Sequence, residues 1–157
     1  MEKRYNLIRI SAIFVIVIIL GGCVSEKTAI SQINWFSNLE DAKTEAQIWK
    51  RPVFVNFTGS DWCGWCIKLE EEVFSKPEFI QYARDNLIMV RLDFPRSKPQ
   101  PVEIQQYNQT IAQQFGIKGF PTILLLDMDG KEIVRTGYQY GGAPAYVQHI
   151  KELLEKI

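Results

Sequence analysis

Residues 61–68 read Asp-Trp-Cys-Gly-Trp-Cys-Ile-Lys, and this stretch decides how the rest of the chain is interpreted. Before it, Val53–Phe57 is a short run of β-branched and aromatic residues, which predicts a buried strand. After it, apolar residues recur among charged ones at roughly helical spacing as far as Phe74, which predicts a helix. Cys63 and Cys66 therefore lie where a strand passes into a helix.

The start of a helix favours a reactive thiol. The first backbone N–H groups there have no acceptor within the helix and carry partial positive charge, so a thiolate is favoured over a thiol. In such settings the pKa of a cysteine falls from ~8.5 to ~3.5–7.5, which makes it a nucleophile at neutral pH. We expect Cys63 to carry its sulfur at the exposed end of the helix. Cys66, one turn deeper, is placed to attack a mixed disulfide and release the product, so the pair predicts a catalytic dithiol–disulfide site.

Two other uses of a cysteine pair are disfavoured. A zinc site needs two further ligands, but there is no second cysteine pair and His149 is the only histidine. Attached haem needs a histidine directly after the second cysteine, where this chain has Ile67. We therefore expect no metal and no cofactor other than a redox-active Cys63–Cys66 disulfide. His149, on the polar side of the last expected helix, and the Glu70–Glu72 run are predicted to be solvated.

The N-terminal sequence predicts export and a lipid anchor. Basic residues precede an apolar run over residues 10–20, about eleven residues long, which fits a signal peptide and is shorter than the ~20 residues of a membrane-spanning helix. Residues 20–23 then read Leu-Gly-Gly-Cys, which resembles the bacterial lipoprotein signal, in which the cysteine is lipidated and becomes the mature N-terminus. An ordinary signal peptide and an uncleaved membrane anchor are the alternatives.

The expected organisation has three parts: a lipoprotein signal peptide over 1–22, a lipidated tether over 23–33 that begins at Cys23, and one domain over 34–157. The whole chain has 18 basic and 18 acidic residues, so its charge gives no argument for binding nucleic acid.

The remaining patterns predict an α/β domain. The expected order of elements gives a central mixed β-sheet of four to five strands flanked by helices on both faces. Ser37 and Ser75 are the expected helix N-caps. The expected helices are 37–50, a cysteine helix ending near 74, 78–86, 103–115 and 144–157. The expected strands are 53–57, 87–93, 122–127 and 131–135, with a possible edge strand at 33–35.

Residues 62–66, together with Gly-Phe-Pro-Thr at 119–122, resemble the active-site motifs of the thioredoxin-like family. The resemblance covers roughly residues 34–157 and implies a thioredoxin fold. It is greatest for the exported branch with Trp-Cys-Gly-Trp-Cys, that of the DsbH-like lipoprotein disulfide reductases. It implies that Cys63 is the attacking thiol and Cys66 the resolving thiol.

The same resemblance implies which residues meet the substrate. Pro121 is expected to be a cis-proline that faces the sulfurs, with the backbone of Phe120 offered to an extended substrate. Trp62, Gly64 and Trp65 are the further expected substrate contacts.

The chain departs from thioredoxin itself in two ways. Gly64-Trp65 replaces Gly-Pro between the cysteines, which leaves the direction of electron transfer open. Asn56 is the nearest match to the buried aspartate that takes a proton from the resolving thiol, and Asp61 is the closest carboxylate in sequence, so no general base is assigned. Three tyrosines near a glycine-rich loop belong either to the core or to the substrate rim: Tyr138, Tyr140 and Tyr146.

Together these features predict an extracytoplasmic thiol–disulfide oxidoreductase on the periplasmic or outer face of a bacterial membrane. It is expected to be a monomer that reduces disulfides of exported proteins. A reductase in an oxidising compartment must be recharged, which implies a membrane electron donor of the DsbD type. The alternatives are an oxidase or isomerase of the same fold, and a lipoprotein that holds client proteins or metal through the same dithiol without turnover.

Overall fold

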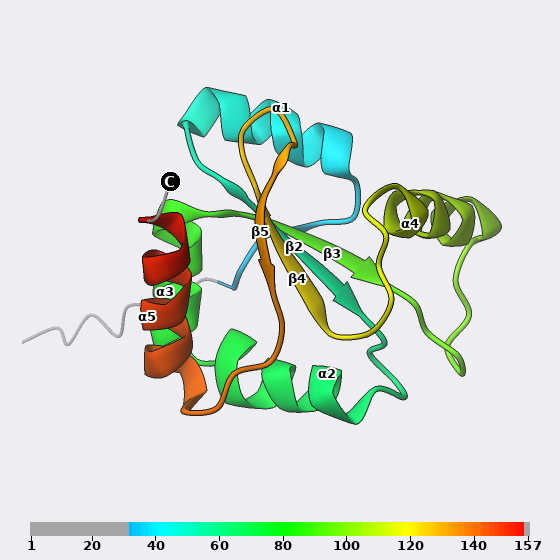
Figure 1. The fold of residues 1–157 in the computed structure, drawn as a ribbon. Coiled ribbons are helices and arrows are strands. Elements are labelled where there is room, and N and C mark those ends of the chain that lie inside the picture. Colours follow the sequence, from blue (N-terminus) through cyan, green and yellow to red (C-terminus); the bar gives the residue numbers. More distant parts are fainter. Residues whose placement is uncertain (1–31, 156–157) are drawn as a thin grey trace, which may run out of the picture.

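The computed structural model describes residues 32–155, which form a five-stranded sheet between two layers of helices (Figure 1). The expected signal peptide, Cys23 and most of the expected tether lie outside the described residues. None of the helices in the described part has the length and hydropathy needed to span a bilayer. The elements in chain order are β1 (Trp35–Phe36), α1 (Leu39–Trp49), β2 (Val53–Thr58), α2 (Gly64–Leu69), η1 (Glu70–Phe74), α3 (Pro77–Asn86), β3 (Ile88–Asp93), α4 (Val102–Gln114), β4 (Thr122–Leu126), β5 (Glu132–Thr136) and α5 (Gly142–Leu154).

The strand order is β1-β3-β2-β4-β5, which confirms the predicted mixed sheet. Strands β1, β3 and β2 run parallel, whereas β4 is antiparallel to both β2 and β5. All six residues of β2 are buried, because this central strand is covered on both faces. The predicted edge strand at 33–35 exists but is shifted along the chain to Trp35–Phe36.

Alternating side chains of the central strands fill two separate cores. Phe54 of β2 and Leu125 of β4 belong to one core, with residues of α2, η1, α3 and α5. Val55 of β2 and Leu124 of β4 belong to the other, with residues of α1 and α4. Successive side chains of a strand point to opposite faces, so each strand supplies both cores. The prediction of helices on both faces is confirmed.

The helix after the cysteines changes its winding part-way, which the sequence did not predict. It is α-helical as far as Leu69 and π-helical in η1. A π-helical turn holds more residues than an α-helical one, which shifts the face that the following side chains present. Val73 and Phe74 are consecutive, yet both are buried, and the ring of Phe74 contacts that of Phe54 in β2.

Two predicted helix caps are replaced by their neighbours. Asn38, not Ser37, caps α1, and its side-chain oxygen accepts a hydrogen bond from the backbone N–H of Glu40 at 2.7 Å. Lys76, not Ser75, precedes α3, and Ser75 instead ends the π-helical segment. Each prediction was wrong by one residue: Asn38 takes the cap of α1, whereas α3 has no side-chain cap, because the Ser75 hydroxyl donates to the carbonyl of Glu71.

The segments that carry the site meet at one end of the central strands. β2 and β3 are parallel and both end there, at Thr58 and Asp93. β4 begins at the same end, because it is antiparallel to β2 and Phe57 pairs with Thr122. The cysteines follow β2 and Pro121 directly precedes β4, so the strand directions bring these two motifs to the same end.

Replacing Asn38 by Ala is expected to lower the free energy of unfolding by about 1 kcal/mol, because the first N–H groups of α1 lose their side-chain acceptor. Urea unfolding followed by circular dichroism measures the change. Ser37→Ala is the matched control and should stay within about 0.5 kcal/mol of wild type. An equal loss in both variants would show that the cap is assigned wrongly.

Candidate active site

Cys63 and Cys66 are joined by a disulfide at the start of α2. Cys63 is the N-cap residue: its Sγ accepts a hydrogen bond from the backbone N–H of Cys66 at 3.3 Å, and its carbonyl accepts one from Ile67 at 3.0 Å. Both cysteines are buried, with 7 % of Cys63 and 4 % of Cys66 exposed. Cys63 is thus buried in this oxidised form, whereas we expected its sulfur at an exposed helix end, and its Sγ lies against the N–H of Cys66 in the first turn of the helix.

The two residues between the cysteines are the accessible part of the motif. Gly64 is exposed, and a Cβ atom added there would have no neighbour within 4 Å. Trp65 has 49 % of its surface exposed. The surface beside the disulfide is therefore open to another polypeptide at Gly64 and bordered by an indole ring at Trp65.

Trp62, on the other side of the motif, is held in place by the fold. Its Nε1 donates a hydrogen bond to the carbonyl of Phe94 at 2.8 Å, and its ring meets that of Phe120 edge to face at 5.8 Å between centroids. The guanidinium of Arg96 lies 3.6 Å from the centre of the same ring. A Cβ on Gly59 would lie 2.5 Å from the indole, so the chain there passes directly against Trp62.

The second predicted motif meets the first at Trp62. The peptide bond between Phe120 and Pro121 is cis, and the hydroxyl of Thr122 donates to the carbonyl of Gly119 at 2.7 Å. Through the ring contact between Phe120 and Trp62, the structure brings the segments before β4 and after β2 together, as the resemblance implied.

Two side chains considered as proton acceptors have other surroundings. Asn56 is buried, and its Oδ1 has no hydrogen-bond partner among the described residues. The carboxylate of Asp61 accepts hydrogen bonds from the backbone N–H groups of Arg96, Ser97 and Lys98 at 3.0, 2.7 and 3.0 Å. The bond from Arg96 contributes most to lowering the pKa of this carboxyl. Asp61 therefore fixes the loop after β3.

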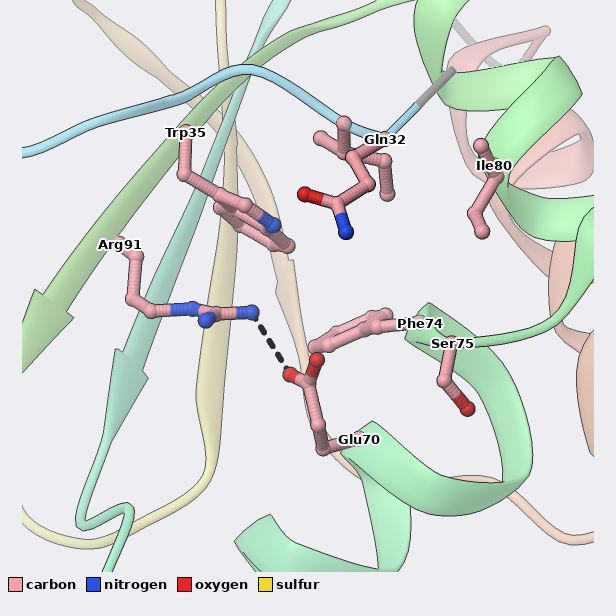
Figure 2. Close-up of a pocket in the computed structure, with 8 residues that line it drawn as sticks. Gln32, Trp35, Glu70, Phe74, Ser75, Ile80 and Arg91 are labelled. Atoms are coloured by element: carbon pink, nitrogen blue, oxygen red, sulfur yellow. Dashed lines mark hydrogen bonds and ion pairs between the residues drawn. The ribbon is translucent and has the colours of Figure 1, made fainter. Parts of the chain in front are cut away.

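A cavity of about 290 Å³ lies beside Cys66, and Glu70, from the acidic run predicted to be solvated, lines it with about half of its side chain exposed. Glu70 forms an ion pair with Arg91, with 2.7 Å between Oε2 and Nη2. Arg91 also stacks over the ring of Trp35 at 4.2 Å. Glu70 and Arg91 also line a second cavity, of about 350 Å³. Figure 2 is a close-up of this second cavity and shows the ion pair between them. The sequence spacing could have indicated that Glu70 lies near Cys66, since Glu70 follows Cys66 by four residues, which is about one helical turn.

The three tyrosines that the sequence left open divide between the core and the surface. Tyr146 is fully buried, and burial raises the pKa of its hydroxyl. Tyr138 is half-buried and Tyr140 is 75 % exposed, and the rings of both contact that of Trp65.

His149 is less exposed than the solvated position predicted for it. It is half-buried, and its Nε2 shares a hydrogen bond with the hydroxyl of Thr136 at 2.8 Å. Sequence periodicity placed it on the polar side of α5, but that side faces the end of β5. Within residues 32–155, no group of three or more His, Cys, Asp and Glu side chains is arranged to hold a metal ion.

A sequence model of the thioredoxin-like domain matches residues 39–152. The chain belongs to the thioredoxin-like family. Disulfide bond reductase DsbH of Chlamydia pneumoniae is 39 % identical over 127 residues, which are 81 % of this chain and 76 % of that protein. A solved structure of a DsbH oxidoreductase superposes with a TM-score of 0.75 and 38 % identity, over 80 % of this chain and 86 % of that one.

Other relatives share the domain within longer proteins. This thioredoxin-like chain is 27 % identical to the thiol:disulfide interchange protein DsbD of Cronobacter sakazakii over 140 residues, and covers 22 % of that protein. A thioredoxin from Thermus thermophilus shares the fold, with a TM-score of 0.58 at 18 % identity. The predicted family and thioredoxin fold are confirmed, and this thioredoxin-like protein is a thiol–disulfide oxidoreductase.

Proposed function

We propose that this protein reduces disulfides of exported proteins, with Cys63 as the attacking thiol and Cys66 as the resolving thiol. The observation that carries the proposal is the Cys63–Cys66 disulfide at the N-terminus of α2, where a backbone N–H donates to the Cys63 sulfur. In the reduced protein such a donor favours the thiolate, which is the form that attacks a disulfide. Similarity to a protein named disulfide bond reductase supports the direction.

The reaction exchanges two disulfides in two steps. The Cys63 thiolate attacks one sulfur of the substrate disulfide, forming a mixed disulfide and releasing the other substrate sulfur as a thiolate. The Cys66 thiolate then attacks the Cys63 sulfur, forming the Cys63–Cys66 disulfide and releasing the second substrate thiolate. The substrate gains two electrons and takes up two protons, and the enzyme dithiol supplies both electrons.

The residues around the disulfide have separate parts in holding the substrate. The open surface at Gly64 lets a polypeptide reach the sulfurs, and Trp65 borders it. Trp62 orders the opposite side by fixing Phe120, whose backbone is offered to an extended substrate beside Pro121. Backbone recognition of this kind suits a reductase that acts on many sequences.

The cavity beside Cys66 supplies a proton acceptor for the second step. Glu70 and Glu71 both line it, and of the two Glu70 is positioned by its ion pair with Arg91. The cavity has room for water, and one water can pass the Cys66 proton to Glu70. Glu70 thereby takes the part of the aspartate that Asn56 replaces.

The N-terminal sequence supports a place outside the cytoplasm. Residues 1–22 are the proposed signal peptide, Cys23 the lipidated residue, and 23–33 the tether. The spent Cys63–Cys66 disulfide is recharged by a membrane electron donor of the DsbD type, and the protein acts as a monomer. No resident metal or cofactor takes part in this scheme.

Cys63→Ser is expected to abolish turnover, because no thiolate attacks the substrate. Cys66→Ser is expected to accumulate mixed disulfides with substrate proteins, which non-reducing gels separate and dithiothreitol releases. A lipoprotein that only holds clients through this dithiol would bind them in the wild-type protein without any turnover. Full activity of Cys63→Ser in a strain that lacks the protein would rule out the exchange mechanism.

The reduction potential of the Cys63–Cys66 pair decides the direction. Equilibration with glutathione or dithiothreitol buffers is expected to give a value near −270 mV, roughly that of thioredoxin. A value near −120 mV, roughly that of DsbA, would make the protein an oxidase. The reduction potential tests only the direction of electron transfer, because a reductase and an oxidase would both use the sulfurs of Cys63 and Cys66.

Glu70→Gln is expected to slow release of a preformed mixed disulfide at pH 7 on the order of a hundredfold, since the amide keeps the shape but accepts no proton. Quenched-flow measurement of the second step gives the rate. Glu71→Gln, an exposed neighbour at the same cavity, is the control and should release at the wild-type rate. Equal rates in all three proteins would show that water, and not Glu70, accepts the proton of the Cys66 thiol.

A further inference from the structure

Three aromatic side chains from two separate elements gather next to the disulfide. Trp65 lies in the first turn of α2, whereas Tyr138 and Tyr140 lie in the loop between β5 and α5. The ring centroids are 5.0 Å apart for Trp65 and Tyr138, 6.2 Å for Trp65 and Tyr140, and 5.3 Å for the two tyrosines. We call these three residues the aromatic patch.

The patch is held in its arrangement by Lys68 and Glu72 of the same helical segment. The Lys68 ammonium lies 5.4 Å from the ring centroids of Trp65 and Tyr138, and 5.6 Å from that of Tyr140. The Tyr138 hydroxyl donates to Glu72 at 2.5 Å, and Glu72 lies 3.7 Å from the Lys68 ammonium. These cation–ring contacts and the hydrogen bond to Glu72 hold the three rings together in the free protein.

The outer face of the patch is uncovered, although its rings are ordered. Tyr140 has 75 % and Trp65 49 % of its surface exposed. Glu72 balances the charge of Lys68, so the patch offers apolar ring surface without an excess of either charge. Such a surface favours an apolar group over a charged one.

The position of the patch decides what reaches it. Disulfide exchange requires that a partner sulfur contact Cys63, and the open approach is over Gly64, next to Trp65 in the chain. The residues beside the partner cysteine must therefore pass the patch. Trp and Tyr rings give large contact areas at a small cost in side-chain entropy, which is why they dominate binding hot spots.

We propose that the aromatic patch binds a large apolar side chain of the partner polypeptide, close in sequence to the cysteine that exchanges with Cys63. The protein thereby prefers disulfides flanked by aromatic or aliphatic residues. The inference rests on the proposed function only in taking Cys63 as the exchanging thiol.

The test compares two peptides that each contain one internal disulfide, flanked by Phe in the first and by Ser in the second. The full chain is used in lipid nanodiscs, and oxidised glutathione serves as a small disulfide without flanking contacts. Tyr140→Ser is expected to lower the second-order rate constant for the Phe peptide about tenfold, which is about 1.4 kcal/mol, and to leave the other two unchanged. Tyr140→Phe should retain the wild-type preference, because the ring of Tyr140, and not its hydroxyl, is expected to contact the peptide.

Val102→Ser on α4 is the matched control, because Val102 is 59 % exposed and lies outside the patch. It should match wild type with all three disulfides. The proposal is overturned if wild type shows no preference for the Phe peptide, or if Tyr140→Ser slows glutathione equally. It is also overturned if light scattering shows wild-type dimers that Tyr140→Ser separates, because the patch would then bind a second copy.

Running the exchange in both directions separates this proposal from the direction of catalysis. Reduced protein is mixed with oxidised peptide, and oxidised protein with reduced peptide. A preference for Phe in both directions supports the patch even if the reduction potential shows an oxidase. No exchange by wild type in either direction would overturn the proposed function and the patch together.

Discussion

The antiparallel pairing of β2 with β4 is the constraint on which the site depends. β2 ends where β4 begins, so the segment with the cysteines and the segment with Pro121 have to meet at one end of the central strands. Burial of all six residues of β2 fixes the register of this pairing, because a slip by one residue would exchange the two cores. The chemistry at this end of the strands thus rests on apolar packing in the middle of the sheet.

The sequence predicted most strongly what short-range chemistry determines. Strand and helix periodicity gave the mixed sheet, and the spacing of Cys63 and Cys66 gave the redox pair and its place at a helix start. Prediction from the sequence failed where two neighbouring residues were equally suitable, or where a contact joined residues far apart in the chain. Ser37 and Asn38 are both good caps, and only the path of the chain selects Asn38. The partner of Glu70 is Arg91 on strand β3, which no local pattern of the acidic run could indicate.

The two tryptophans of the motif illustrate the same limit. They have the same residue type and similar places beside a cysteine, yet Trp62 is fixed by a hydrogen bond, a ring contact and a stacked guanidinium. Trp65 has its contacts on one side only and keeps half of its surface free. Periodicity cannot separate these situations, because both depend on loops that arrive from distant parts of the chain. The result is an ordered side and an accessible side of one disulfide.

That difference gives the protein two optical probes with separate meanings. Trp62 is enclosed by protein groups, so its emission should follow the state of the neighbouring sulfurs and of the loop that holds it. Trp65 is in contact with water, so its emission should shift to shorter wavelength when a partner displaces that water. With Trp35 and Trp49 replaced as well, variants that keep a single indole let fluorescence time the arrival of a partner separately from the transfer of electrons.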